Sequence, residues 1–224
     1  MGYTKTIVCL ANSRKPPSGG RCIAGREYSQ AGFGPWVRPV SARPTAEISE
    51  EERRYEDGTD PAVLDVVRIS MVEPRPRGHQ QENHLIDDGI YWSKVRRLTW
   101  ADLESALERP SGPLWTNGCS SSHGENDRIP EREAAELSRS LYLIRPLDLV
   151  LVVALEGERR KLRARFKLGR YSYSIVVTDP RVERSYFSRE DGDYPLEEAL
   201  LCVSLGEPFH GYTYKLAAAV IRPA

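Results

Sequence analysis

Long apolar segments are absent from this sequence, and so is any close pairing of its cysteines. No apolar run reaches the roughly 20 residues that a membrane-spanning helix requires, and KTIVCL is too short for the apolar region of a secretory signal. No two cysteines follow the Cys-x-x-Cys spacing, which favours reduced thiols over a disulfide framework. The four cysteines are Cys9, Cys22, Cys119 and Cys202. We therefore expect a soluble, cytoplasmic protein with no membrane partner.

Signatures of common catalytic sites are also absent. The sequence has no Gly-x-Ser-x-Gly elbow, no phosphate-binding loop and no dinucleotide-binding fingerprint. Cys202 lies in the apolar run ALLCVSLGEP, where we expect a buried small hydrophobe rather than a nucleophile. We accordingly expect no catalytic residue and no cofactor. A metal-dependent nuclease built on His79, Glu82 and Asp127 stays open as an alternative.

Net charge is missing as well, because 32 basic residues are balanced by 32 acidic residues. Attraction of the whole molecule to a polyanion is therefore excluded, and only local patches could bind nucleic acid through charge. Residues 1–43 carry seven lysines and arginines against a single acid, Glu27. Residues 159–170 carry seven cations and no acid. The sequence thus predicts two basic patches on a neutral chain.

Short strand patterns separated by glycine and proline fill most of the chain, which predicts a mainly β protein of barrels or sandwiches. KTIVCLAN and RCIAGREY are typical strands, and the segment 13–20 between them is expected to be a loop. Two helical patterns are short: one begins at Ser49 inside an acidic insert at 45–61, and the other spans 99–108. A proline-flanked linker predicts two domains, 1–112 and 113–224.

The segment RRKLRARFKLGRYSYSIVV, residues 159–177, alternates cations with apolar residues and then turns aromatic. In a strand, the apolar side chains would face a core and the cations would share the opposite face. Tyr171 and Tyr173 follow on a returning strand. Cations that track phosphates beside rings that stack on bases are typical of a groove for single-stranded nucleic acid. The alternative is an edge strand that its charges protect from aggregation. The cations on the shared face are Arg159, Lys161, Arg163, Arg165 and Lys167.

Polar side chains gather in two further segments. The first segment contains His79, Gln80, Glu82, Asn83 and His84, and the second contains Cys119, His123, Glu125, Asn126, Asp127 and Arg128.

Three interpretations of these polar segments stay open. His79 and His84 with Cys119 and His123 could form a four-ligand zinc site, although the spacings match no standard finger, and we expect no metal. A hydrogen-bonded network that fixes loop geometry is a second interpretation. The third is a ligand pocket that reads a base or nucleotide edge. Its readers would be Gln80, Asn83 and Arg128.

Several blocks of the sequence resemble the dual-OB-containing domain family of bacterial proteins. They are ANSRKPPSGGRCIAG, WVRPVS, HQQENH, GENDRI, RARF, VTDP and LCVSLGEPFHGYTYKLAAAVI, and they span nearly the whole chain in one order. The resemblance implies two tandem OB-like barrels that recognise nucleic acid or a nucleotide, often within systems that defend against invading genetic elements. The acidic insert at 45–61 departs from simple members of the family.

We therefore expect a module that binds single-stranded nucleic acid or a nucleotide and reports to a separate effector protein. If the charged strand is not the binding surface, cations of the first barrel are the next candidates. These are Arg14, Lys15, Arg21 and Arg38. A pure protein-interaction module that uses the acidic insert is a further alternative.

Overall fold

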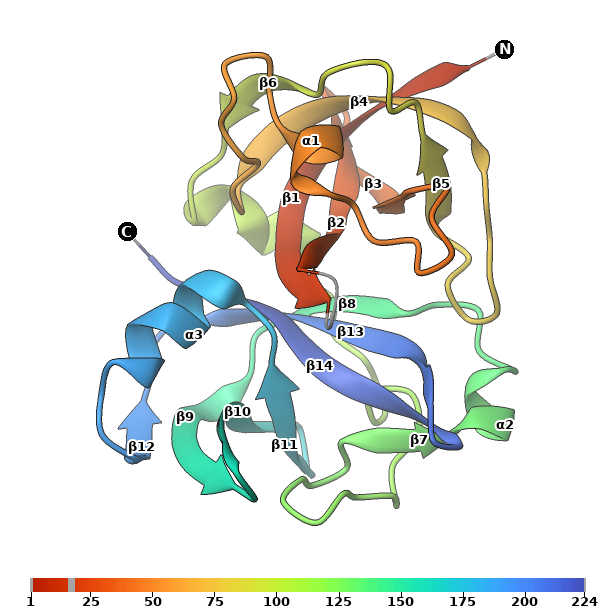
Figure 1. Ribbon diagram of the computed structural model, residues 1–224. Helices are drawn as coiled ribbons and strands as arrows, with labels where there is room; N and C mark the ends of the chain where they lie inside the picture. The colour runs from red at the N-terminus through yellow and green to blue at the C-terminus, as the bar shows by residue number, and fades with distance from the viewer. Residues whose placement is uncertain (1, 16–18, 224) are drawn as a thin grey trace. The chain divides into compact units, whose positions relative to one another are not determined.

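The computed structural model describes residues 2–15 and 19–223, with 53% of the chain in strands and 10% in helices. The prediction of a mainly β protein is confirmed. The chain divides into two compact units, Met1–Ala106 and Leu107–Ala224 (Figure 1). The segment 107–112, expected to end the first domain, falls in the second unit. Among the described residues, no helix has the length and apolar character needed to cross a membrane.

The first unit is a closed five-stranded barrel. Its strands pair in the order β1-β2-β3-β5-β4, and β4 returns to pair with β1 and closes the ring. β3 and β5 run parallel, whereas the other pairs of the ring are antiparallel. A sixth strand, β6, extends the sheet from β4. The strands are β1 (Tyr3–Lys15), β2 (Gly20–Ser29), β3 (Gly32–Val40), β4 (Asp65–Pro74), β5 (Asn83–Ile86) and β6 (Ser93–Arg97).

The first strand serves both sides of this barrel because it is long and bent. Residues 3–8 of β1 pair with β4, and residues 7–15 pair with β2. The register shifts between Cys9 and Ala11, and a bulge of this kind bends a strand and increases its twist. The loop expected at 13–20 therefore begins later than predicted, since residues 13–15 belong to β1. Residues 16–18 of that loop lie outside the described residues.

The acidic insert is built into the first barrel. Its helix α1 (Glu50–Arg53) begins after Ser49, as predicted, and has a capping box. The Ser49 hydroxyl accepts from the Glu52 amide, and the Glu52 side chain accepts from the Ser49 amide. Ile48 and Tyr55, on either side of this helix, lie in the barrel core. The insert is thus a folded part of the unit and not an extended acidic arm.

The second unit repeats the strand order of the first. Its strands pair as β9-β10-β11-β14-β13-β8, and β11 runs parallel to β14. Two short strands lie at its margins, where β12 pairs with β9 and β7 pairs with β14. The strands are β7 (Arg128–Pro130), β8 (Leu141–Ile144), β9 (Leu147–Glu156), β10 (Arg159–Leu168), β11 (Tyr171–Val177), β12 (Gly192–Pro195), β13 (Leu200–Phe209) and β14 (Tyr212–Ile221).

In the second unit, β8 and β9 together play the part that β1 plays alone in the first. Only Arg145 and Pro146 separate them, and β8 pairs with β13 while β9 pairs with β10. Pro146 has no N–H to donate, so the hydrogen-bonded ladder is interrupted at this bend. The same stretch of chain still joins both ends of the strand order. The prediction of two OB-like barrels is confirmed.

The helices of the described residues are short, as expected, but two of them were missed. η1 (Ala101–Ala106) is a 3-10 helix within the predicted segment 99–108. The missed helices are α2 (Glu131–Ala134), which follows β7, and α3 (Pro180–Phe187), which lies between β11 and β12 (Figure 1). Asp179 caps α3 by accepting from the amides of Arg181 and Val182, and Tyr186 packs into the core of the second barrel.

Candidate functional site

The central cation of the charged strand does not face solvent. Arg163 is only 7% exposed, and its guanidinium donates to both carboxylate oxygens of Glu156, at 2.5 and 3.0 Å. A third donation reaches Asp127 Oδ2 at 3.4 Å. The expectation that Arg163 lines an open basic face is therefore wrong. The segment around Asp127 covers this part of β10, so alternation along the strand did not decide exposure.

Three other cations of the same strand are paired with acids. Arg165 and Lys167 are exposed, and Arg160 is partly exposed. Their partners come from β9, from β12 and from the residue just before β12. The pairs are Arg160–Asp191, Arg165–Asp193 and Lys167–Asp148. Arg159 is exposed and Lys161 is partly exposed. The run of positive charge seen in the sequence is thus largely balanced in space by neighbouring strands.

The two tyrosines of the returning strand have different environments. Tyr173 has 0% exposure, and its ring stacks on Phe166 with centroids 5.1 Å apart. Its hydroxyl accepts from the Leu114 amide at 2.9 Å. Tyr173 is therefore a core residue whose ring no base can reach. Tyr171 is partly exposed, and its hydroxyl accepts from Arg170 Nη2 at 3.1 Å.

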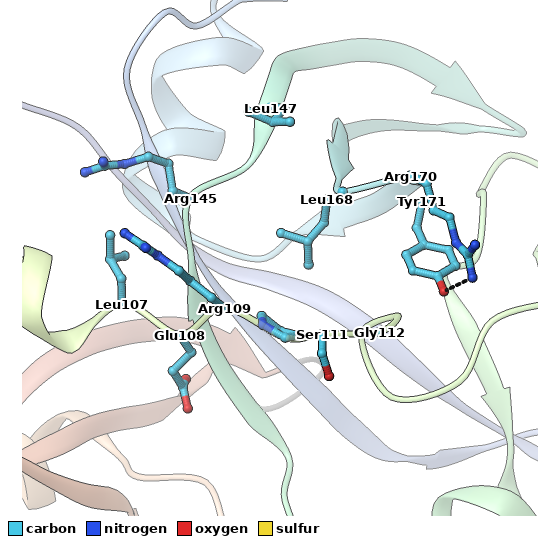
Figure 2. A pocket seen from close by; sticks show the side chains of 12 residues that line it. Leu107, Glu108, Arg109, Ser111, Gly112, Arg145, Leu147, Leu168, Arg170 and Tyr171 are labelled. Carbon is cyan, nitrogen blue, oxygen red and sulfur yellow. Dashed lines mark hydrogen bonds between the residues drawn. The ribbon is translucent and has the colours of Figure 1, made fainter.

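Tyr171 lines a cavity of about 540 Å³ in the second unit. Three chain segments form its walls, namely the start of the unit, the bend between β8 and β9, and the turn between β10 and β11 (Figure 2). Arg109 and Arg145 extend in a similar direction on one side, and Arg170 lies with Tyr171 on the other. The twelve lining residues are Leu107, Glu108, Arg109, Pro110, Ser111, Gly112, Arg145, Leu147, Leu168, Gly169, Arg170 and Tyr171.

This cavity combines positive charge with an apolar surface. The side chains of Leu147 and Leu168 lie between its two cationic sides (Figure 2). Glu108 is its single acidic lining residue, and that carboxylate accepts from Arg139 and from the Leu143 amide. The charge of the lining is therefore positive, and the arrangement can bind an anion that carries an apolar or aromatic group.

In the first barrel, the predicted cations are divided between surface and interior. Arg14 and Arg21 are cross-strand neighbours in the β1–β2 pair, and both are partly exposed. Lys15 Nζ donates to the carbonyl of Thr45. Arg38 is buried, and its guanidinium pairs with Glu82 at 3.0 Å. Arg38 therefore supports the β3–β5 junction and is not open to a phosphate.

The first polar segment forms contacts within the first barrel. His79, Gln80 and Asn83 are buried, and Asn83 Nδ2 donates to Gln80 Oε1 at 3.3 Å. His84 Nδ1 lies 2.5 Å from the Tyr3 hydroxyl, and burial lowers the pKa of His84. These side chains hold β5 and the loop before it.

The second polar segment fills the gap between β11 and β14 in the second barrel. Glu125 pairs with Ser174 of β11, and β7 pairs with β14. Asn126 accepts from the Gly118 amide and donates to the Ser172 carbonyl. Asp127 accepts from the amide and hydroxyl of Ser121. These bonds support the network interpretation of the polar segments.

The zinc and nuclease interpretations both require a cluster of metal ligands. Among the described residues, no group of three or more His, Cys, Asp or Glu side chains could hold a metal ion. His79 and His84 belong to the first unit, whereas Cys119 and His123 belong to the second. Glu82 and Asp127 are engaged by Arg38 and Arg163.

Comparison with known proteins decides the family. A family model described as the dual OB-containing domain matches residues 5–220. The chain belongs to this family. Among solved structures it is similar to one described as "Crystal structure of the tetrameric p202 HIN2", with 9% sequence identity, a TM-score of 0.33, and coverage of 97% of this chain and 91% of that chain. At that TM-score the likeness carries no argument. No curated protein matches the chain.

One buried cation of this dual-OB chain was missed from the sequence. Lys215 of β14 is 1% exposed, and its Nζ donates to the Thr116 carbonyl at 2.6 Å and to Asn117 Oδ1 at 2.8 Å. Burial lowers the pKa of Lys215 to about 7, because the charged form loses its hydration. Nothing in the strand pattern of YKLAAAVI distinguishes this lysine from an exposed one. The ammonium fastens the segment before β7 to the barrel.

A second missed feature of the dual-OB chain is the hairpin between β13 and β14. Phe209 is 62% exposed, and its ring lies 4.2 Å from that of His210. Arg128, predicted to read a base edge, stacks its guanidinium 4.0 Å from the Tyr212 ring centroid. The run PFHGYTY could have indicated this aromatic turn. Arg128 thus packs against the hairpin.

Proposed function

We propose that this chain binds single-stranded nucleic acid or a nucleotide through the cavity of its second barrel. The observation that carries the proposal is the lining of that cavity, which joins three arginines to Tyr171 and three leucines. Arginine guanidinium groups pair with phosphate oxygens, and aromatic rings stack on bases. Membership of the dual-OB family supports the same function, since OB barrels bind oligonucleotides on one face.

The charged face of β10 is a weaker candidate for the same role. Three cations of this strand, Arg160, Arg165 and Lys167, are paired with Asp191, Asp193 and Asp148, so a polyanion would compete with carboxylates for these three. The cavity has one acid, which is engaged elsewhere. The cavity also combines its arginines with the partly exposed ring of Tyr171 and with apolar side chains, which the charged face of β10 does not.

A fluorescence anisotropy titration with a labelled oligothymidine at several salt concentrations tests this function. Affinity should fall as salt rises, with a slope of about −0.7 per phosphate neutralised. Arg145→Gln should flatten the slope by about one phosphate equivalent, because one guanidinium contact is lost. Tyr171→Leu should weaken binding by about 1–3 kcal/mol at every salt concentration if a base stacks on the ring.

Arg184→Gln is the matched control, because Arg184 is an exposed arginine of α3 in the same unit and lies outside the cavity lining. This control should bind as the wild type does. Wild-type protein that binds no oligonucleotide at low salt would contradict the proposal. Equal affinity of the cavity variants and the control would move the binding surface to other residues, with Arg14, Lys15 and Arg21 the next to test.

A sensing role completes the proposal. The resemblance described above supports a place in a bacterial defence-type system, where binding would be reported to a separate effector protein. The acidic insert is the part of the chain considered for protein contacts, and Glu50 and Glu51 of α1 are exposed. Its folded position in the first barrel supports a fixed docking point more than a flexible arm.

A further inference from the structure

The cavity is small compared with the length of a bound single strand. About 540 Å³ falls within the range of small-ligand sites, about 300–1,000 Å³. Single-stranded nucleic acid occupies about 4–16 nucleotides on one OB barrel. The cavity can therefore enclose one nucleotide, while the rest of a strand would lie outside it.

Two arginines lie on the same side of the cavity. Arg109 and Arg145 come from separate segments, the start of the unit and the bend between β8 and β9, and extend in a similar direction (Figure 2). Each guanidinium can donate two parallel hydrogen bonds to phosphate oxygens. An internal phosphodiester carries one negative charge. A terminal phosphate carries about −1.5 to −2 at neutral pH and offers three strong acceptor oxygens.

The other side of the cavity suits the base of such a nucleotide. Arg170 donates to the Tyr171 hydroxyl at 3.1 Å, and its guanidinium lies 5.2 Å from the centroid of that ring. These contacts hold Tyr171 in place before a ligand arrives. Leu147, which is 56% exposed, and Leu168 supply apolar surface beside it. One side thus matches a phosphate group and the other a planar ring.

We infer that the cavity binds a nucleotide that carries a terminal phosphate, with Arg109 and Arg145 on the phosphate and Tyr171 against the base. This inference rests on the proposed function and names the ligand of the same site. Two sources share this chemistry, namely the phosphorylated end of a single strand and a free mononucleotide. In either case the site recognises an end and not an internal position.

The test compares four unlabelled competitors of a 5′-phosphorylated, fluorescent oligothymidine. They are oligothymidines of one length with a 5′-phosphate, a 3′-phosphate or two hydroxyl ends, and a closed circular single-stranded DNA. A strand with a phosphate at one of its ends should compete about tenfold better than the hydroxyl strand and the circle, which corresponds to about 1.4 kcal/mol. Thymidine monophosphate, used as the competitor in a separate titration, distinguishes the two sources. It should displace the labelled strand only if a free mononucleotide is enough to occupy the cavity.

Two further arms tie the preference to the named residues. The Arg109→Gln/Arg145→Gln double variant should bind both kinds of strand equally, whereas Arg184→Gln should keep the preference. The preference should also shrink below a pH of about 6, where a terminal phosphate loses its second charge. A preference that is unchanged in the double variant would assign the phosphate to other residues and overturn the inference.

Failure of this inference is distinguishable from failure of the proposed function. If all the strands compete equally, whether phosphorylated, hydroxyl-ended or circular, the inferred preference for a terminal phosphate is overturned. The proposal of nucleic-acid binding is then unaffected. Absence of binding by every competitor and by the labelled strand would overturn both. The comparison between ligands uses wild-type protein, so it does not depend on whether a variant folds.

Discussion

At the scale of single residues, Lys215 makes the stability of the second barrel depend on pH. Its pKa is lowered from 10.5 to about 7 by burial. Between these two values the unfolded chain holds a proton that the folded chain does not, so the free energy of unfolding rises as pH rises. We expect a slope of at most about 1.4 kcal/mol per pH unit from this residue. Denaturant unfolding at pH values across this window measures it.

The Lys215→Met variant isolates that contribution. It should lose the part of the pH dependence that Lys215 supplies, because methionine fills a similar volume and carries no proton. The difference between wild type and variant should therefore change with pH across the window. Two parallel curves would contradict the assignment and would show that the buried ammonium titrates as in the unfolded chain.

Arg163 and Arg165 allow a second prediction at this scale, since they lie two positions apart on one strand. Arg163→Gln should destabilise the fold by about 3–5 kcal/mol, because it leaves the buried Asp127 and the partly buried Glu156 without their cation. Arg165→Gln breaks only an exposed pair and should cost about 0–1 kcal/mol. Urea unfolding followed by tryptophan fluorescence compares the two. Equal effects would mean that the burial of Arg163 has no energetic consequence.

At the scale of elements, the segment before β7 bridges β11 and β14 beyond the two residue pairs at which these strands pair directly. It contacts β11 through Glu125 and leads into β7, which pairs with β14. Asp127 accepts from Arg163 of β10, and Lys215 of β14 donates to Thr116, so both ends of the segment are fastened to the barrel. A Cβ at Gly124 would lie 1.9 Å from Asp127 Oδ2, and that carboxylate is held by Ser121 and Arg163. The close approach explains why glycine occupies this position.

Gly124→Ala should therefore destabilise the protein by about 1–3 kcal/mol through crowding. Gly112→Ala is the control, because a Cβ there would meet nothing within 4 Å. The control should be neutral or slightly stabilising, by up to about 1 kcal/mol, since alanine restricts the unfolded chain. Thermal unfolding of both variants decides the matter. A tolerated Gly124→Ala would show that the segment moves aside easily.

The helices and strands also show which features of the fold could be predicted from the sequence and which could not. The helix that begins at Ser49 and the helix within 99–108 were found because their signals are local. The cap of α3 was equally local, with Asp179 before Pro180, but it was missed because its helix lies between strand patterns. Arg163 was assigned to the surface by alternation, and Tyr173 was expected beside the same cations. Their partners Asp127 and Leu114 lie 36 and 59 positions earlier in the chain, and periodicity carries no information about such contacts.

At the scale of the whole molecule, strand content was predictable from residues, whereas barrel topology was not. Many short strands indicate barrels or sandwiches, but the parallel pairing of β3 with β5, and of β11 with β14, depends on contacts far apart in sequence. The OB arrangement was anticipated only through family resemblance. The balance of charge around β10 was likewise not predictable from the sequence, because it depends on contacts between distant residues. Acids placed on β9 and around β12 balance the cations of β10 only after folding.

The bend at Pro146 distinguishes the second barrel from the first. The first barrel is closed by one unbroken strand, whereas the second is closed by two strands with Arg145 and Pro146 between them. The break places Arg145 in the lining of the cavity. Where one architecture is present twice, one copy can keep an unbroken strand while the other accepts an interruption, and a cavity lies at that interruption.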